Sequence, residues 1–355
     1  MAVTGYTLFS NYNGLGNFVK VISLIRTQYL YDVTTEEMVE GAIKGVVESL
    51  DDPYSNYLDQ ETFKKLTEQI HGSFGGLGIL VGVEGDYLTV VLPYEDTPAD
   101  KEGIKAGDKI VKINSEDVVG LDLDAAINML RGPVGSEVNI TVLRQDEEIE
   151  KTLVREEIRV PTVQGEIVPD TEIGYVQISQ FTEITADELD EVLTKLKEKD
   201  IKGLVLDLRN NPGGELVSAT RVADEFISQG PIVHIDYKQG EDKTYNAKKP
   251  ALNLPLVVLI NGHSASAAEI LAGAIKDHQV GTLVGTTSFG KGVVQIVFPL
   301  DNGAGLKLTT ARYLTPNKHD INKKGIEPDV VVELPEDAEQ DVQLEKALEV
   351  LKEKM

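Results

Sequence analysis

Short, continuous apolar runs alternate with segments of helical periodicity through the second half of the chain. Gly203–Leu208 and Leu254–Ile260 are mostly apolar, which is typical of strands buried on both faces. Residues 186–199, 215–227 and 267–275 instead carry apolar residues at the spacing of one helix face. This alternation predicts a mixed α/β core.

The first half of the chain shows two other patterns. Residues 16–70 have helical spacing, and Thr34 with Glu37 forms the start signal of one of the helices. Residues 71–157 contain alternating, strand-like segments separated by glycines, and a short helix is expected at 121–130. We therefore expect four parts, which are a helical N-terminal region (1–70), a β-rich domain (71–157), an α/β core (158–337) and a C-terminal helix (338–355).

Composition and charge argue against several classes of function. The 355 residues suffice for two or three domains, and 41% hydrophobic with 26% charged residues is an ordinary globular composition. A net charge of −25 disfavours nucleic acid, whose phosphates would be repelled. The chain has no cysteine, and its five histidines show no metal-ligand spacing, so we expect no metal and no cofactor.

Two serines stand where a buried strand turns into a helix. Ser264 and Ser266 follow the apolar run 254–260 and precede the helical run 267–275. A hydroxyl at such a turn lies near free backbone N–H groups and the positive end of the helix dipole, which suits a nucleophile. The alternative is that a serine here serves only as a helix N-cap.

A lysine between two glycines favours the catalytic interpretation. Lys291 lies in Phe289-Gly-Lys291-Gly292, just before the apolar segment Val293–Leu300. A desolvated lysine can be the base for a serine nucleophile, and we expect Phe289, Val293 and Val294 to bury it. His263 is an alternative base, but it is adjacent to Ser264 and should point away along the same turn.

These motifs resemble the carboxyl-terminal processing proteases, also called tail-specific proteases. The resemblance rests on Ser264-Ala-Ser266-Ala-Ala268-Glu269-Ile270, then Phe289-Gly-Lys291-Gly and Gln295, and it spans residues 16–351. It implies a serine endopeptidase with a Ser-Lys dyad, in which Ser266 is the nucleophile, Lys291 the base and Gln295 the residue that orients the lysine. It also implies a crotonase/Clp-like α/β core with an inserted PDZ domain.

The resemblance assigns roles to two glycine-rich loops. Gly213 of Arg209-Asn-Asn-Pro-Gly213-Gly214, together with the N–H of Ala267, would form the oxyanion hole, and Gly214 is the alternative to Gly213. The loop 74–79 would bind a substrate carboxylate through the PDZ domain, in which the peptide-binding residues are Gly76, Leu77, Gly78, Ile79 and Met129. Val81, Ala126 and Leu130 would complete the apolar pocket there.

The resemblance also implies partners and a location. The partners would be protein or peptide substrates with apolar C-termini, and a second copy could dimerise through the N- and C-terminal helices. The first ten residues lack a signal-peptide pattern. Since the family is exported, we expect a periplasmic or extracytoplasmic protein, membrane-tethered by a leader absent from this chain, with a cytoplasmic location as the alternative. Two rival functions remain, which are a catalytically silent PDZ binding protein and an acyl-CoA enzyme of crotonase-like fold.

Overall fold

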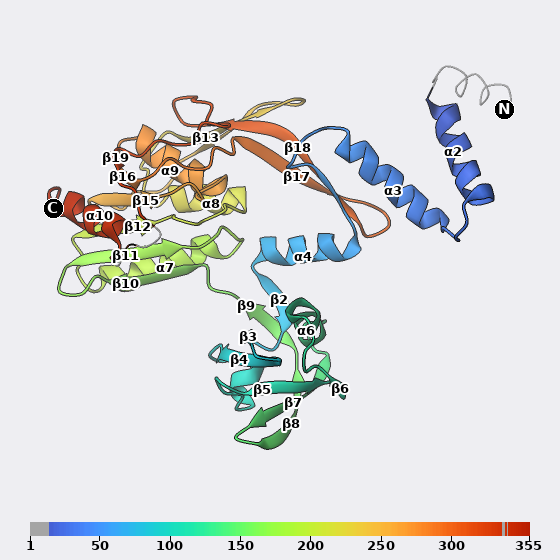
Figure 1. Cartoon of the computed structure of the whole chain (residues 1–355). Helices are drawn as coiled ribbons and strands as arrows, with labels where there is room; N and C mark the ends of the chain where they lie inside the picture. The colour runs from blue at the N-terminus through green and yellow to red at the C-terminus, as the bar shows by residue number, and fades with distance from the viewer. Residues whose placement is uncertain (1–13, 336–337, 339) are drawn as a thin grey trace. The chain divides into compact units, whose positions relative to one another are not determined.

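The computed structural model describes residues 14–335, 338 and 340–355 (Figure 1). The initial segment that lacks a signal-peptide pattern, and residues 336, 337 and 339 near the start of the expected C-terminal helix, lie outside the described residues. The chain forms two compact units, which are residues 1–63 with 294–311, and residues 64–293 with 312–355. None of the helices in the described ranges is long and apolar enough to cross a membrane.

The first unit contains the predicted N-terminal helices and most of a long hairpin. Its helices and strands are α2 (Leu15–Gln28), α3 (Thr35–Glu48), β1 (Asn56–Leu58), β17 (Val293–Pro299) and β18 (Gly305–Leu314). Helix α3 begins as predicted, because the Thr34 hydroxyl accepts from the Glu37 N–H while the Glu37 carboxylate accepts from the Thr34 N–H. Strand β1 pairs antiparallel with the beginning of β18.

Helix α4 (Gln60–His71) leads into the β-rich domain. The chain first forms β2 (Ser73–Gly76), which pairs antiparallel with β9 (Glu156–Arg159), where the chain leaves the domain. Strand β2 ends at Gly76, and β3 begins at Ile79. Leu77 and Gly78 lie between them, and Gly78 has a φ of 73°, so the strand breaks there.

The main sheet of this domain encloses its own hydrophobic core. Its order is β3-β4-β5-β7-β8, with β6 beside β5. The core includes Leu88, Ile110, Ile140, Ala126 and Leu130. The helices and strands are β3 (Ile79–Glu84), β4 (Tyr87–Pro93), α5 (Pro98–Lys101), β5 (Lys109–Ile113), β6 (Glu116–Asp117), α6 (Leu123–Leu130), β7 (Glu137–Arg144) and β8 (Glu147–Val154).

A six-stranded sheet forms the centre of the second unit. Its order is β10-β11-β12-β15-β16-β19, and the pairs from β11 to β19 are parallel. Every residue of β12 and β15 is buried, as their continuous apolar runs predicted. The strands are β10 (Val163–Ile167), β11 (Ile173–Ile178), β12 (Gly203–Asp207), β15 (Leu256–Ile260), β16 (Thr282–Gly285) and β19 (Val330–Val331).

Helices cover both faces of this sheet, which confirms the mixed α/β fold class. Leu351 of α10 packs on Gly203, whereas Leu196 of α7 packs near Gly174 and Leu204 on the other face. The remaining helices and strands are α7 (Thr185–Lys197), α8 (Leu216–Ala223), β13 (Pro231–Tyr237), β14 (Lys243–Asn246), α9 (Ala267–Asp277) and α10 (Val342–Lys352). The exact limits of the four expected parts stay a prediction.

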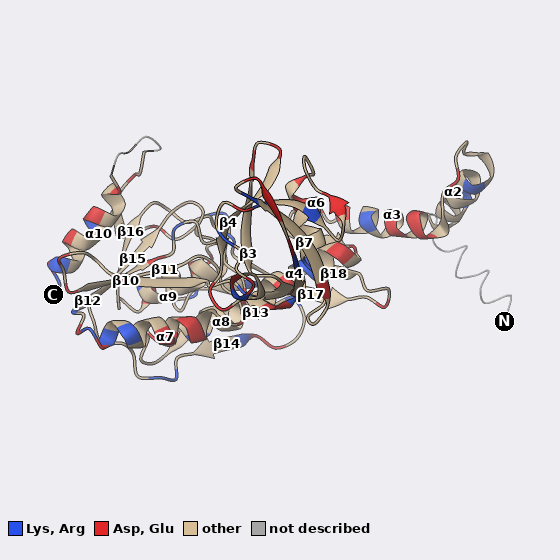
Figure 2. Ribbon diagram, turned by 90° about the horizontal axis from the view of Figure 1, so that it is seen from below, with Lys and Arg blue, Asp and Glu red and all other residues tan. Residues whose placement is uncertain are grey.

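Charged side chains are mixed on the outer helices. Figure 2 shows acidic and basic residues interspersed on α7 and α10. Several pair with each other, including Arg221 with Asp187, and Lys346 with Glu349. Neither helix therefore presents a surface of one sign of charge.

Candidate active site

The turn between β15 and α9 holds Ser266 in an unusual backbone conformation. Its φ of 54° and ψ of −113° lie in a region that residues other than glycine rarely occupy. Such a conformation costs roughly 1–3 kcal/mol and is concentrated at functional sites. Ser266 is half-buried, and it directly precedes the first residue of α9. The arrangement places a hydroxyl on a tight strand-to-helix turn, a position that the nucleophilic serine also has in α/β-hydrolases.

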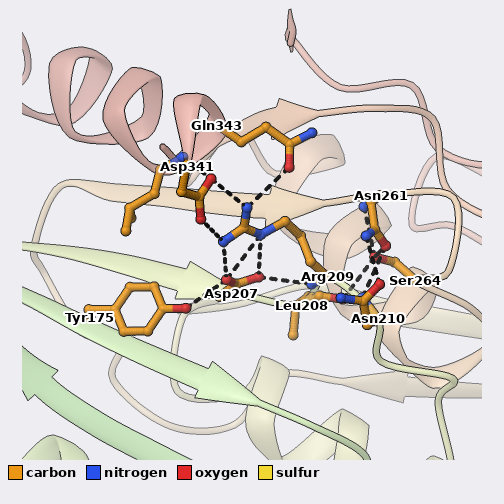
Figure 3. Close-up of polar contacts among 10 residues, drawn as sticks. Tyr175, Asp207, Leu208, Arg209, Asn210, Asn261, Ser264, Asp341 and Gln343 are labelled. Atoms are coloured by element: carbon orange, nitrogen blue, oxygen red, sulfur yellow. Dashed lines mark hydrogen bonds and ion pairs between the residues drawn. The ribbon is translucent and has the colours of Figure 1, made fainter. Parts of the chain in front are cut away.

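Ser264, in contrast, is a structural residue. Its side chain is fully buried, and its Oγ donates to the Leu208 carbonyl at 2.8 Å while accepting from the Asn261 N–H at 2.9 Å. These bonds join the end of β12 to the end of β15 (Figure 3). Because the hydroxyl is inaccessible and already bonded on both sides, Ser264 is a poor candidate for the nucleophile.

The loop after β12 packs directly on the serine turn. The Asn210 N–H donates to Asn261 Oδ1 at 3.0 Å, and the Ala265 N–H donates to the Asn211 carbonyl at 2.9 Å. A Cβ on Gly213 would lie 2.8 Å from both the Ser266 Cβ and the Ala267 nitrogen. Only glycine fits this approach, especially at the φ of 96° that Gly213 adopts. The packing of these two loops therefore brings Ser266, Ala267 and Gly213 close together, as the resemblance implied, while their roles stay predictions.

The expected oxyanion donors differ in whether their N–H groups already donate a hydrogen bond within the protein. The Gly213 N–H already donates to Oδ1 of the fully buried Asn211 at 2.8 Å, so an oxyanion would have to share or displace that acceptor. The structure gives the N–H groups of Gly214 and Ala267 no acceptor among the described residues. The pairing of Ala267 with Gly214, which was the alternative, fits this geometry at least as well as the pairing with Gly213.

Lys291 lies on a tight loop between β16 and β17. Its own N–H donates to Glu269 Oε2 at 2.9 Å. A Cβ on Gly290 or Gly292 would lie within 3 Å of backbone atoms of residues 322 and 324, which explains the glycines on either side of the lysine. Lys291 is half-buried and Phe289 is 53% exposed, and the expected burial of the lysine by Phe289 stays a prediction.

The sequence-based interpretation missed the role of Glu269. This residue is fully buried, and its carboxylate accepts hydrogen bonds from the serine turn and from the lysine loop. A signal was present, because Ser266-x-x-Glu269 has the spacing of a capping box. That pattern predicts the bond between the Glu269 carboxylate and the Ser266 N–H. It gives no information on the bond to the N–H of Lys291, which is 22 residues away.

A second missed feature is an ionic cluster behind the loop after β12. Arg209 donates to both carboxylate oxygens of the buried Asp207 and of Asp341, at 2.7–3.0 Å (Figure 3). Asp341 is the N-cap of α10, so the cluster ties the C-terminal helix to this loop. The guanidinium lowers the pKa of Asp341 against the opposing effect of burial. Burial, with the Asp207 charge, raises the pKa of Tyr175, whose hydroxyl donates to Asp207 at 2.7 Å.

Two other residues assigned from the sequence, Gln295 and His263, have surroundings of their own. Gln295, on β17, belongs to the first compact unit, where its side-chain amide donates to Thr309 Oγ1 at 3.2 Å. Its predicted role in orienting Lys291 stays a prediction. His263 is exposed and lines a cavity of about 600 Å³ with Asn261 and Asp341.

The expected peptide-binding residues lie together in the β-rich domain. Gly76 ends β2, Leu77 and Gly78 form the connection, and Ile79 begins β3. Ile79, Val81 and Met129 are partly buried side chains packed on the domain core, whereas Ala126 and Leu130 belong to the core itself. In the described part of the chain, no cluster of three or more acidic or histidine side chains could hold a metal ion.

Comparison with known proteins identifies the family. A model of peptidase family S41 matches residues 172–332, a PDZ domain model matches residues 89–144, and a model of the activating protease CtpB N-terminal domain matches residues 6–62. The carboxy-terminal-processing protease of Bartonella bacilliformis is 42% identical over 335 residues, which cover 92% of this chain and 76% of that protein. The carboxy-terminal processing protease CtpA of Bacillus subtilis is 39% identical, covering 94% and 71%.

A solved structure agrees with this result. The photosystem II D1 C-terminal processing protease has a TM-score of 0.53 and 31% identity, and the match covers 94% of this chain and 90% of that chain. The resemblance predicted from the serine and lysine motifs is thus confirmed, while the roles of individual residues stay predictions. The chain belongs to the carboxy-terminal processing proteases of peptidase family S41, and it contains a PDZ domain.

Proposed function

We propose that this protease cleaves unstructured proteins with a Ser266-Lys291 dyad after its PDZ domain has bound the substrate's C-terminus. The observation that carries the proposal is the shared anchoring of both residues. Ser266 occupies a strained turn against the glycine loop, and the backbone of Lys291 is bonded to the same carboxylate as the backbone of Ser266. Ser264 is buried and bonded on both sides, which leaves Ser266 as the available hydroxyl.

The proposed mechanism uses general-base and covalent catalysis. Ser266 Oγ attacks the scissile carbonyl carbon while neutral Lys291 takes the hydroxyl proton. The N–H of Ala267, with that of Gly213 or Gly214, stabilises the oxyanion of the tetrahedral intermediate. Lys291 then protonates the leaving amine, and water hydrolyses the acyl-enzyme by the reverse sequence of proton transfers. These steps use no metal and no cofactor.

Substrate choice would follow from the PDZ domain. The N–H groups of residues 77–79 suit a free carboxylate, and β3 offers an edge on which an extended peptide can add a strand. Ile79 and Met129 are partly buried apolar side chains beside this region, so an apolar last residue is favoured. We therefore expect substrates with apolar C-termini.

The test is digestion of a disordered protein that ends in alanine or leucine. The wild-type chain should cleave it, and the Ser266→Ala and Lys291→Ala variants should not. Equal cleavage by the wild type and Ser266→Ala would refute the dyad. Binding of the substrate's terminal peptide without any cleavage by the wild type would indicate a silent binding protein instead.

The proposal also covers the oligomeric state of the protein and its location in the cell. Helix α2 exposes Leu15, Phe18, Val19, Val21 and Leu24, each between 42% and 52% accessible, and such an apolar surface fits a second copy of this chain. We expect a homodimer in solution that the Phe18→Glu substitution weakens, measured by light scattering. We also expect the protein to be exported and tethered, which fractionation of its native cells would test.

A further inference from the structure

Glu269 is a buried carboxylate with an unusually complete set of donors. It is fully buried at the third position of α9, where an unpaired charge would be very costly. Oε1 accepts from the Ser288 hydroxyl and from the Gly290 N–H, each at 2.6 Å. Oε2 accepts from the Ser266 N–H at 2.8 Å and from the Lys291 N–H at 2.9 Å. The four bonds neutralise most of the cost of burying the charge.

These bonds go beyond what a helix cap requires. Of these four bonds, a capping box accounts only for the one that the Ser266 N–H donates to the Glu269 carboxylate. The bonds to Gly290 and Lys291 reach a separate loop, which follows β16 rather than β15. One carboxylate oxygen therefore joins the backbone of the proposed nucleophile directly to the backbone of the proposed base.

The strained backbone of Ser266 is held from both sides. Its N–H is bonded to Glu269, and its carbonyl accepts from the hydroxyl of the buried Tyr313 at 3.1 Å. The Tyr313 hydroxyl also lies 3.5 Å from Glu269 Oε2. Strained conformations persist only where the surroundings over-determine them, and here Glu269 and Tyr313 supply that restraint.

We infer that Glu269 is a positioning residue for catalysis, which sets the distance between Ser266 and Lys291 by binding the backbone N–H of both. This inference rests on the proposed dyad. Misplacing a reacting group by about 1 Å can cost on the order of 100-fold in rate, so loss of the shared anchor should slow the chemical step. Substrate capture by the PDZ domain should not change, because its groove is formed by other residues.

The decisive variants differ in how many of the four bonds they remove. Glu269→Gln keeps the shape, but either orientation of the amide turns its NH₂ group toward a backbone N–H of the lysine loop, that of Gly290 or that of Lys291, so at least one bond to this loop is lost. Glu269→Ala removes all four. We expect kcat to fall about tenfold or more in Glu269→Gln and about 100-fold or more in Glu269→Ala, with KM changed by less than about threefold.

A matched control separates positioning from stability. Glu188 on α7 also accepts two bonds, from the Thr162 N–H at 2.8 Å and the Thr162 hydroxyl at 2.6 Å, but none from the serine turn or lysine loop. Glu188→Ala should lower the melting temperature without lowering kcat. A serine-reactive phosphonate, which bonds covalently to a serine activated by its base, should label Glu269→Gln more slowly than Glu188→Ala.

The results distinguish this inference from the proposed function. If wild type and Ser266→Ala cleave equally, the dyad itself fails. If wild type is active and Ser266→Ala inactive, the inference is overturned when folded Glu269→Gln keeps kcat within about threefold of wild type. It is also overturned when Glu188→Ala, at an equal loss of melting temperature, loses kcat and phosphonate labelling to the same extent.

Discussion

The two serines of the turn should respond to substitution in opposite ways. Ser264→Ala removes a buried hydroxyl, which leaves the Asn261 N–H without its acceptor and the Leu208 carbonyl with only the Asn211 N–H at 3.3 Å. Leaving such groups unsatisfied costs about 1–3 kcal/mol. Ser266→Ala removes a half-buried hydroxyl from a position where the backbone bonds to Glu269 and Tyr313 remain. Its effect on stability should stay within about 0.5 kcal/mol.

Thermal unfolding and substrate cleavage measure the two effects separately. For a domain of this size, Ser264→Ala should lower the melting temperature by roughly 3–10 °C while retaining a substantial fraction of cleavage at 25 °C. Ser266→Ala should melt like the wild type and cleave nothing. The expected result is thus one destabilised, active variant and one stable, inactive variant.

The opposite pattern would refute the assignment of roles. If Ser264→Ala is folded at the assay temperature but inactive, and Ser266→Ala still cleaves, then the nucleophile is not Ser266. Loss of activity in both variants with unchanged melting of both would contradict the structural role given to Ser264.

Three other predictions follow from the same structure. The pKa of lysine is ordinarily near 10.4, so the cleavage rate should rise steadily as pH rises and more of the lysine is neutral. Lys291→Arg should be inactive because arginine cannot give up its proton. An active Lys291→Arg enzyme would point to His263 as the base. Because Arg209 lowers the pKa of Asp341, Asp341→Asn should lower the melting temperature at pH 7, and its difference from wild type should shrink below about pH 4 as the wild-type carboxyl is protonated. Amidation of a substrate's C-terminus, or a terminal Asp-Asp, should slow its cleavage about tenfold or more, as timed on a gel against an alanine-ended substrate; equal rates would show that the PDZ domain does not select C-termini.

The sequence by itself determined the fold class and the local positions of the main site residues. Continuous apolar runs predicted β12 and β15, and the Thr34 capping box predicted the start of α3, because both signals depend on neighbouring residues. The motifs around Ser266 and Lys291 indicated the family, which the comparisons confirmed. Each of those motifs is a short run of neighbouring residues, so it can be identified without knowing the rest of the fold.

Only the tertiary structure decided which polar groups meet. Ser264 and Ser266 are equivalent by spacing, yet contact with Leu208 buries one hydroxyl while the strained turn leaves the other accessible. The Arg209–Asp341 pair joins residues that are 132 positions apart in the sequence. Glu269 accepts a hydrogen bond from Lys291, which is 22 positions away. Such contacts depend on strand order and on which helix covers which face of the sheet. Local periodicity repeats every two or about 3.6 residues, so it carries no information on partners at these separations.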